Sequence, residues 1–246
     1  MIEDLLPGEI MSSEAFDDSQ PCALFLAEEA VISGAVEKRR REFTTARWCA
    51  RDALRRLGYP LVPVVPGAKG APVWPPGVVG SITHCAGYRA AAVARSDDIT
   101  TLGIDAEPNK PLPPGILETI AVDDESRWVT DFLRRDPSAR WDRLLFSAKE
   151  SVYKAWFPLA PRREPRLDFT EASITFDPVG GGFLARLLVE GPRLHDGSEL
   201  REFSGRWLVR GGLVITAIAV VATAPDASDD RDPPLLGEAE QGRIRL

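Results

Sequence analysis

The amino-acid sequence predicts an α+β fold made of two similar lobes, each a small antiparallel sheet packed on a helix. A helical pattern followed by short β-strand patterns occurs twice along the 246 residues. With 44% hydrophobic residues, the chain can bury a sizeable core in one domain or in two small lobes. We find no residue-level repeat, so the duplication is inferred from element order alone. We expect an N-terminal lobe over residues 1–107, a C-terminal lobe over 108–224 and a disordered tail over 225–246.

The first half of the chain predicts one helix, one loop and three strands. Residues 33–57 have apolar positions at helical spacing, and Gly58-Tyr59-Pro60 ends the pattern. The proline- and glycine-rich stretch 60–77 predicts a loop. Three β patterns joined by short turns follow, over residues 78–84, 88–95 and 100–107.

The second half repeats this order of elements. After a proline-rich stretch at 108–115, helical patterns cover residues 116–135 and 141–156. A second proline-rich loop then precedes four further β patterns, over residues 172–176, 183–190, 205–210 and 213–221.

The composition excludes several classes of protein. No apolar run is long enough to cross a bilayer, and the N-terminus lacks the basic-then-apolar pattern of a signal peptide. The 3 cysteines have no metal-like spacing, which predicts reduced thiols and a cytoplasmic protein. A net charge of −7 and a pI near 5.1 argue against general nucleic-acid binding. We expect a monomer with no membrane or nucleic-acid partner.

Three acidic residues form a candidate metal site. Asp105 and Glu107 end the third predicted strand, and a side-chain period of two places both carboxylates on one face, about 7 Å apart along the chain. In the predicted helix 141–156, Glu150 and Lys154 lie one turn apart, opposite the apolar stripe. An oxygen-rich pocket of this kind suits Mg²⁺, which completes its shell with water and phosphate oxygens. The plain alternatives are two solvated acids at a strand end and an ordinary i,i+4 surface pair.

Basic residues elsewhere in the sequence suit a polyanionic ligand. Arg47 and Arg51 lie one turn apart beside the apolar face of the first helix, and arginine forks suit phosphate. Lys69 stands in a loop whose glycines let a phosphate approach the backbone. His84 ends a strand of small and hydroxyl residues and can donate to phosphate. A solvated helix face and a structural histidine are the plain alternatives. Cys85 is not expected to be a nucleophile, because adjacent strand residues face opposite ways.

Together these segments resemble the Sfp/EntD-type 4′-phosphopantetheinyl transferases, most closely their actinobacterial branch. The motifs Gly103–Glu107 and Phe146–Trp156 in combination are the most specific. The actinobacterial members also share Thr83–Arg89 and Lys154–Leu159. In chain order, the matching motifs are Arg47-Trp48-Cys49-Ala50-Arg51-Asp52-Ala53-Leu54, Lys69-Gly70-Ala71-Pro72, Gly80-Ser81-Ile82-Thr83-His84, Gly103-Ile104-Asp105-Ala106-Glu107 and Phe146 to Trp156.

The resemblance implies two lobes related by a pseudo-twofold, with coenzyme A in the cleft between them. The residues implied at the 3′-phosphate are Arg39, Arg47 and His84. Those implied along the nucleotide are Lys69 and Thr83, with the backbone around Gly67 and Ala68. The implied magnesium ligands are Asp105, the Ala106 carbonyl, Glu107 and Glu150, together with pyrophosphate oxygens.

This chain departs from the family pattern at two positions. Ser151 stands where alanine is more frequent, a small change that should be tolerated. Pro66 stands where close relatives carry another lysine, which removes one phosphate contact.

The implied reaction moves the 4′-phosphopantetheine group of coenzyme A to a serine of an acyl or peptidyl carrier protein and releases 3′,5′-ADP. The serine hydroxyl needs a base and a neutralised phosphate. Glu150 is the candidate base, directly or through a metal-bound water, and a role as metal ligand only stays open. Lys154 would neutralise the transferring phosphate, and Asp105 completes the predicted catalytic set.

Two other functions are alternatives. A magnesium-dependent phosphohydrolase would use the same acids on water, but no nucleophile motif or second metal cluster supports it. A non-enzymatic module that binds coenzyme A or a carrier would not need three acids focused on a cation. The sequence does not specify which carriers are modified. Leu112, Ile116 and Leu117 follow the metal acids and suggest a carrier-docking patch, and packing at the lobe junction explains them equally well.

Overall fold

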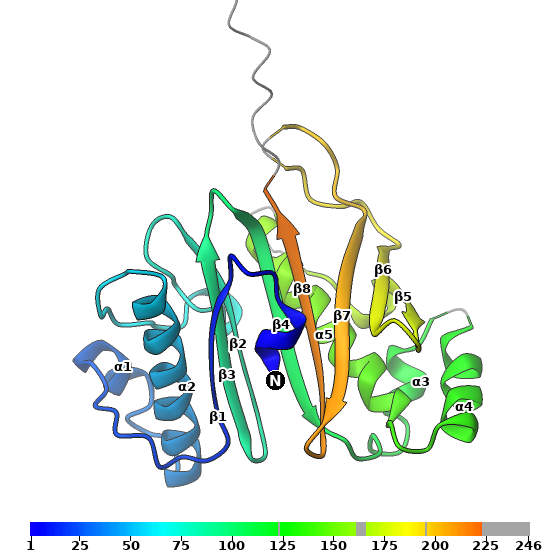
Figure 1. The fold of residues 1–246 in the computed structure, drawn as a ribbon, viewed down its shortest axis with the longest axis horizontal. Coiled ribbons are helices and arrows are strands. Elements are labelled where there is room, and N and C mark those ends of the chain that lie inside the picture. The colour runs from blue at the N-terminus through cyan, green and yellow to red at the C-terminus, as the bar shows by residue number, and fades with distance from the viewer. Residues whose placement is uncertain (123, 161–165, 195, 223–246) are drawn as a thin grey trace, which may run out of the picture.

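The protein is described here from a computed structural model that covers residues 1–122, 124–160, 166–194 and 196–222. In these residues, two antiparallel sheets lie side by side with helices packed against them (Figure 1). The predicted α+β class is therefore confirmed. The pseudo-twofold relation and the division of the chain at residue 107 stay predictions, and the predicted tail over 225–246 lies outside the described residues.

The strands are β1 (Met11–Ala15), β2 (Val78–Cys85), β3 (Tyr88–Arg95), β4 (Ile99–Pro108), β5 (Ala172–Asp177), β6 (Gly182–Leu187), β7 (Glu202–Arg210) and β8 (Leu213–Val221). The α-helices are α1 (Leu26–Val31), α2 (Glu37–Arg56), α3 (Ile116–Ile120), α4 (Glu125–Arg135) and α5 (Trp141–Trp156). None of the helices in the described residues is long and apolar enough to span a membrane.

The structure corrects three sequence predictions. Strand β1 was missed because its buried positions include serines, which give no apolar pattern. The first long helix is shorter than predicted and starts only after Val36, whose backbone is extended (φ −64°, ψ 154°). The predicted helix 116–135 is two helices, because the chain becomes extended at Ala121 (φ −78°, ψ 142°).

The smaller sheet has the strand order β1-β3-β2 and is covered on one face by α2. Strand β3 is buried on both faces. Ala91 and Val93 belong to the cluster shared with α2, whereas Ala90, Ala92 and Ala94 belong to a second cluster. This explains why β3 is an unbroken run of small apolar residues rather than an alternating strand.

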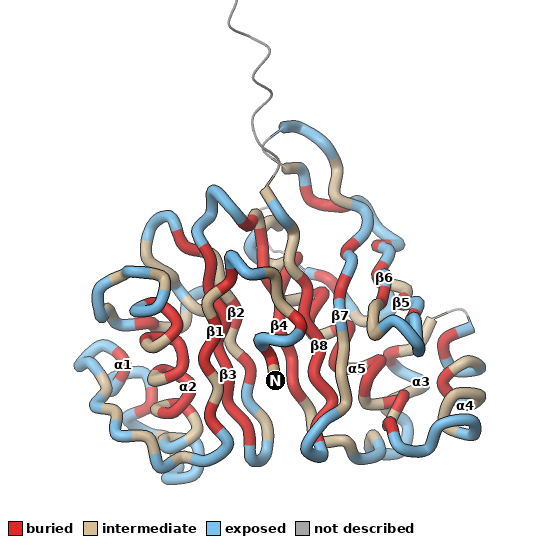
Figure 2. The backbone as a smooth tube through the Cα atoms, viewed as in Figure 1, coloured by how far each residue is buried: buried red, intermediate tan, exposed pale blue. Residues whose placement is uncertain are grey.

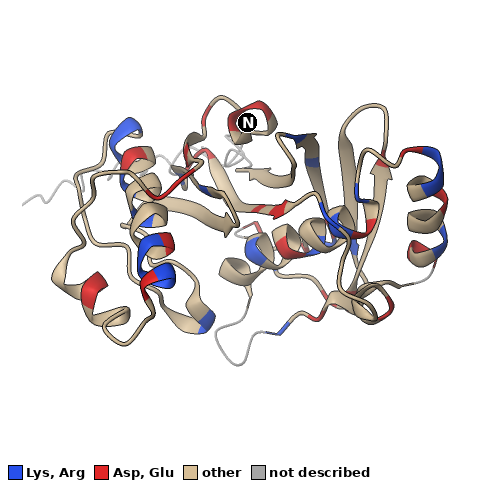
Figure 3. Ribbon diagram, turned by 90° about the horizontal axis from the view of Figure 1, so that it is seen from below, with Lys and Arg blue, Asp and Glu red and all other residues tan. Residues whose placement is uncertain are grey.

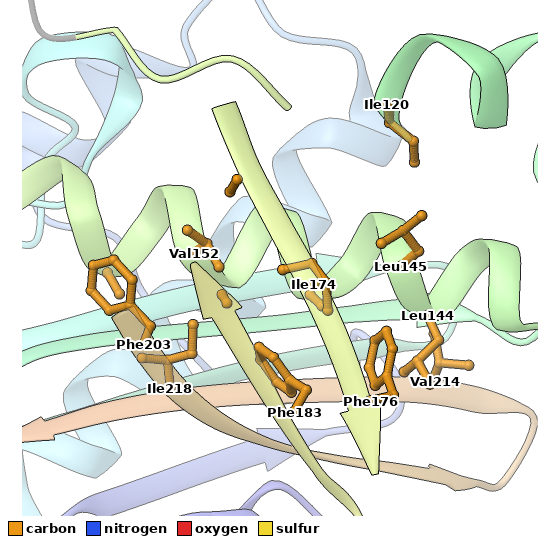
Figure 4. Packing of buried hydrophobic residues seen from close by; sticks show 14 of the residues in the cluster. Ile120, Leu144, Leu145, Val152, Ile174, Phe176, Phe183, Phe203, Val214 and Ile218 are labelled. Carbon is orange, nitrogen blue, oxygen red and sulfur yellow. The ribbon is translucent and has the colours of Figure 1, made fainter. Parts of the chain in front are cut away.

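The larger sheet has the strand order β4-β8-β7-β6-β5 and carries α5 on one face. Its core is formed by Leu145 and Val152 of α5, with large side chains such as Phe176, Phe183 and Phe203 from the strands (Figure 4). Strand β4 ends at Pro108, so nearly all of it belongs to the first half of the chain. It nevertheless pairs with β8 from Ile99 to Pro108, with a register shift between Ile99 and Thr101.

A shared apolar core joins the two sheets. It contains Ile2 and Leu5 from the N-terminal turn, Tyr88 from the smaller sheet, and Ile104 and Ile215 from the larger one. Figure 2 shows the corresponding continuous block of buried strands in the middle of the molecule. Because one core serves both sheets, the two halves of the chain are held as a single body.

The facing edges of the two sheets meet at β2 and β4. The Ile104 amide donates to the Ser81 hydroxyl over 3.1 Å, and the Ala106 amide donates to the Thr83 hydroxyl over 3.0 Å. Equal steps of two residues on both sides show that the two strands run in the same direction. Serine and threonine hydroxyls therefore take the place of a backbone ladder at this junction.

Helix α5 lies very close to β4 because β4 contains Gly103. A Cβ atom at this position would lie only 2.1 Å from the Ser151 carbonyl oxygen. The Thr101 hydroxyl donates to the Ala155 carbonyl over 2.6 Å and fixes the same contact. The close packing brings the acids of β4 beside Glu150 and Lys154 of α5.

Candidate functional site

A cavity of about 680 Å³ opens between the two halves of the molecule. Its walls come from α2, the loop after α2, β2, the start of β4 and α5. The volume is in the range of sites for cofactor-sized molecules. The predicted residues that line it are Arg39, Arg47, Lys69, His84, Glu150 and Lys154.

Asp105 contacts Thr83 of β2 and Lys154 of α5, and it is not among the residues that line the cavity. The residue is 5% exposed. Oδ1 accepts hydrogen bonds from the Lys154 ammonium at 2.8 Å and from the Thr83 hydroxyl at 3.2 Å. Oδ2 is buried and has no hydrogen-bond partner in the described part of the chain. An unpartnered buried carboxylate oxygen is costly, which makes this atom a candidate ligand for a cation.

Glu107 is held away from the cavity by a basic residue of α5. Its Oε2 accepts from Nη1 of Arg143 over 3.0 Å, and both side chains are half-buried. Burial is the main cause of a raised pKa for the Glu107 carboxyl, and the neighbouring Asp105 carboxylate adds to it. Arg143 opposes both effects, so it stabilises the ionised form of Glu107.

Glu150 lies on α5 where it faces the cavity. Burial raises the pKa of its carboxyl. The Lys154 charge opposes this effect, and the Asp105 carboxylate adds a smaller increase. Lys154 pairs with Asp105 and with the Ile104 carbonyl, rather than forming the plain i,i+4 pair with Glu150. A carboxylate with a raised pKa is better matched to accepting a proton near neutral pH.

The three acids are not assembled into a metal site. In the residues that the structure describes, no three acidic, histidine or cysteine side chains are grouped as ligands for a metal ion. Their chemistry nevertheless suits a hard cation, because they offer only oxygen donors and Asp105 keeps one buried oxygen unpartnered. Two protein cations, Lys154 and Arg143, already contact the acids of β4.

Arg47 is fixed at the cavity wall by its surroundings. It is 7% exposed, it donates from Nε to the Val64 carbonyl over 2.6 Å, and its guanidinium lies 4.0 Å from the centre of the Phe43 ring. Burial lowers its pKa to about 10, so the side chain stays charged at neutral pH. The Val64 amide in turn donates to buried Glu28 over 2.9 Å, which holds this segment in place.

Arg51 was grouped with Arg47 as a phosphate candidate, and the structure gives it another role. Its guanidinium pairs with Glu28 over 3.0 Å and donates to the Ala23 carbonyl over 3.1 Å. Both members of this ion pair are buried, which ties α2 to the segment around α1. Arg51 is therefore a structural residue and does not line the cavity.

His84 and Arg39 are in direct contact at the end of β2, where Nη1 of Arg39 meets Nε2 of His84. Burial and the nearby Arg39 charge lower the pKa of the imidazole. His84 is therefore neutral at pH 7 and accepts a hydrogen bond from Arg39 through Nε2. The pair forms a compact basic group at the cavity wall.

The loop that carries Lys69 makes a tight turn at the rim. Lys69 has a left-handed backbone (φ 52°), which is uncommon for a residue other than glycine. Gly70 follows with φ 80°, and the Gly67 amide donates to the Ala71 carbonyl over 2.7 Å. Gly67 and Ala68 belong to this turn but are not among the residues that line the cavity.

The sequence interpretation missed a buried ion pair behind the site. Lys149 and Glu125 lie 2.8 Å apart and are 1% and 2% exposed. The Lys149 ammonium also donates to three backbone carbonyls, and Glu125 accepts from the Ile174 amide over 2.6 Å. The signal was present, since Lys149 falls on the apolar stripe of α5, four residues after Leu145. A lysine on that stripe indicates a buried partner.

Comparison with known proteins identifies the family of the chain. Residues 27–94 match the model of the 4′-phosphopantetheinyl transferase N-terminal domain, and residues 101–216 match that of the 4′-phosphopantetheinyl transferase superfamily. The chain therefore belongs to the 4′-phosphopantetheinyl transferase family of enzymes, in its actinobacterial branch.

Individual relatives match over nearly the whole chain. The 4′-phosphopantetheinyl transferase Svp of Streptomyces mobaraensis is 52% identical over 94% of this chain and 94% of its own length. Npt of Nocardia iowensis is 46% identical over 89% of this chain and 99% of its own length. PptT of Mycobacterium tuberculosis is 47% identical over 89% and 98%, respectively.

Proposed function

We propose that this enzyme transfers the 4′-phosphopantetheine group of coenzyme A to a serine of acyl or peptidyl carrier proteins, with magnesium, and releases 3′,5′-ADP. The observation that carries the proposal is the composition of the main cavity. Basic residues of the first half of the chain share one space with Glu150 and Lys154 of α5. A ligand with phosphates at both ends of a nucleotide suits this arrangement.

The basic residues would bind the nucleotide part of coenzyme A. Arg47, Arg39 and His84 lie on the wall formed by α2 and β2 and would hold the 3′-phosphate. Lys69 and the turn around Gly67 would lie along the nucleotide at the opposite rim. Thr83 contacts Asp105 and the β4 backbone, and so would act by keeping Asp105 in place. Ala68 would contribute only its backbone.

Two residues of α5 would do the chemistry. Glu150 would accept the proton of the carrier serine, since burial and Asp105 raise the pKa of its carboxyl toward the range of a useful base. Lys154 would neutralise charge on the transferring phosphate. It is held in place by the Asp105 carboxylate and the Ile104 carbonyl, so its position does not depend on the ligand.

Magnesium would be held by Asp105, Glu107, Glu150 and the Ala106 carbonyl. When bound, it would neutralise the negative charge of the pyrophosphate. The unpartnered Oδ2 atom of Asp105 supports this ligand set. The raised pKa values of Glu107 and Glu150 also fit it. Burial is the main cause of both and the Asp105 carboxylate adds to it, and a divalent cation would stabilise the ionised forms against both effects.

The partners would be acyl and peptidyl carrier proteins, met by a monomer in the cytoplasm. The docking patch suggested by the sequence receives little support. Leu112, Ile116 and Leu117 are partly buried and pack against the core of the larger sheet. This favours the packing alternative for the three residues, and we do not assign the carrier surface to them.

Incubating the enzyme with coenzyme A, magnesium and an apo-carrier protein tests the proposal. We expect the carrier to gain the mass of phosphopantetheine on its serine, with 3′,5′-ADP in the supernatant. Glu150→Gln should lose most of this activity in either of its roles. Release of phosphate without modification of the carrier would indicate a hydrolase. Binding of coenzyme A with no product would indicate a binding module.

A further inference from the structure

Arg143, on the first turn of α5, contacts the candidate metal ligand Glu107 and has no assigned role. Its guanidinium makes three contacts in a fork. Nη1 donates to Glu107 over 3.0 Å, Nε donates to the Lys110 carbonyl over 3.1 Å, and Nη2 donates to the Pro111 carbonyl over 2.8 Å. The side chain is 17% exposed. All three acceptors lie at or just after the end of β4.

The two carbonyl contacts decide which partner of the ion pair can move. With two backbone acceptors, the guanidinium keeps its position even when the carboxylate leaves. The Glu107 carboxylate lies at the end of a flexible side chain. Within the described residues, Arg143 is the only residue that donates a hydrogen bond to this carboxylate. The planar arginine fork suits this fixed placement better than a lysine would.

We propose that Arg143 is a fixed counter-ion that competes with the divalent cation for Glu107. In the present arrangement Glu107 is paired with Arg143, and the acids are not grouped as metal ligands. Glu107 would leave Arg143 for the cation when the metal site is filled. The inference rests on the metal site in the proposed function, and it concerns how tightly that site binds metal rather than which reaction follows.

Charge balance supports the competition. Asp105 is paired with Lys154, and Glu107 is paired with Arg143, so both acids of β4 are neutralised by cations of α5. Asp105 keeps a second, unpartnered oxygen, and it need not leave its lysine to bind a cation. Glu107 is already paired with the Arg143 guanidinium. A metal ion that binds Glu107 would have to break this ion pair or bind close to its positive charge. Arg143 should therefore set the metal affinity of the free enzyme.

The experiment measures Mn²⁺ binding to the enzyme without coenzyme A, from the electron paramagnetic resonance signal of free Mn²⁺. Arg143→Gln should bind Mn²⁺ about fivefold more tightly than the unsubstituted protein, as expected for loss of a half-buried competing ion pair. The gain should shrink as salt is added, because salt screens the competing charge.

Arg140→Gln is the matched control. Arg140 lies beside the start of the same helix and pairs with Asp142, which is not a candidate metal ligand. The substitution changes the net charge equally, so its effect on Mn²⁺ affinity should stay below about twofold. If Arg143→Gln does not fold, Arg143→Lys replaces it. A lysine lacks the fork that reaches three acceptors, and we expect a smaller gain of the same sign.

Glu107→Gln separates failure of this inference from failure of the metal site. If Glu107→Gln weakens Mn²⁺ binding while Arg143→Gln leaves it unchanged or weaker, Glu107 is a ligand and Arg143 does not compete. That result overturns the inference alone. If Glu107→Gln binds Mn²⁺ like the unsubstituted protein, Glu107 is not a ligand, and both the inference and this part of the proposed site are wrong.

Discussion

At the scale of single residues, the site is governed by which charged groups are fixed before any ligand arrives. Arg47 is held by a backbone carbonyl and an aromatic ring, and Lys154 by Asp105 and a second carbonyl. His84 is neutral because burial and then the Arg39 charge lower the pKa of its imidazole. Fixed charges of this kind lose little conformational freedom on binding, so they can contribute more to affinity than mobile surface lysines. Figure 3 shows that charged residues lie on helices at both ends of the molecule, on the central helix and on several strands.

Arg47→Met should weaken the binding of coenzyme A about tenfold, as expected for loss of a charge-assisted hydrogen bond. The affinity for dephospho-coenzyme A, which lacks the 3′-phosphate, should change little. Isothermal calorimetry with both ligands measures the difference. Equal losses for the two ligands would remove Arg47 from the 3′-phosphate site.

The affinity for coenzyme A should rise as the pH falls from about 8 to about 6.5, the range in which a histidine takes up a proton. Burial and Arg39 depress the pKa of His84 in the free enzyme, and a bound phosphate dianion would raise it. Only the protonated imidazole of His84 makes the additional contact with the phosphate. The gain in affinity is therefore complete below the pKa of His84 in the free enzyme, and it is lost as the pH rises through the pKa of His84 in the complex.

Calorimetry at several pH values, with His84→Gln and with dephospho-coenzyme A, checks this prediction. Both should give a flatter pH profile, because one lacks the titrating group and the other lacks the phosphate. A His84→Gln profile as steep as that of the unsubstituted protein would assign the proton uptake to another group.

At the scale of elements, α5 connects the chemistry to the core. One of its faces presents Glu150 and Lys154 to the cavity, and another packs Leu145 and Val152 into the larger sheet. Lys149 anchors the helix by its ion pair with Glu125 and by the carbonyls of Ile120, Phe169 and Ala172. Because Glu150 follows Lys149 directly, the anchor also limits how far the candidate base can move.

Lys149→Met should destabilise the protein by about 3–5 kcal/mol, because it leaves the buried Glu125 carboxylate without its cation. Arg186→Met removes a partner from the exposed pair with Glu202 and should cost less than about 1 kcal/mol. Urea unfolding measures both. Adding Glu125→Leu to Lys149→Met should recover part of the loss, and a double variant less stable than the single one would contradict this account.

At the scale of the whole molecule, the site exists because two sheets meet edge to edge. The cavity takes basic residues from the side of α2 and β2, and Glu150 and Lys154 from α5. The shared core and the two hydroxyl contacts between β2 and β4 set the distance between these sides. Any change that separates the edges should therefore affect stability and ligand binding together.

Thr83→Val should destabilise the protein by about 1–3 kcal/mol, the cost of leaving the buried Ala106 amide without an acceptor. Thr83→Ser keeps the hydroxyl at this position and should cost less. Urea unfolding of the two variants separates the hydrogen bond from the lost methyl group. A larger destabilisation by Ser than by Val would show that packing of the methyl group, rather than the hydroxyl, holds the edges together.

Much of the fold and of the site could be read from the sequence, because it depends on local patterns. The helical periodicity of residues 141–156 predicted α5, and the three β patterns between residues 78 and 107 predicted β2, β3 and β4. Six of the predicted binding and catalytic residues line one cavity, and the motifs identified the family. Strand spacing and helical spacing are properties of short segments, so they are visible without the rest of the chain.

Only the tertiary structure decided the partners of the charged residues. Arg51 faces Glu28 rather than the cavity, Lys149 is a buried anchor, and Arg143 holds Glu107. The pairing of β4 with β8 and the hydroxyl junction with β2 likewise join segments far apart in the chain. The physical reason is that the role of a charge depends on what lies opposite it in space and on how far water is excluded, and folding alone determines both.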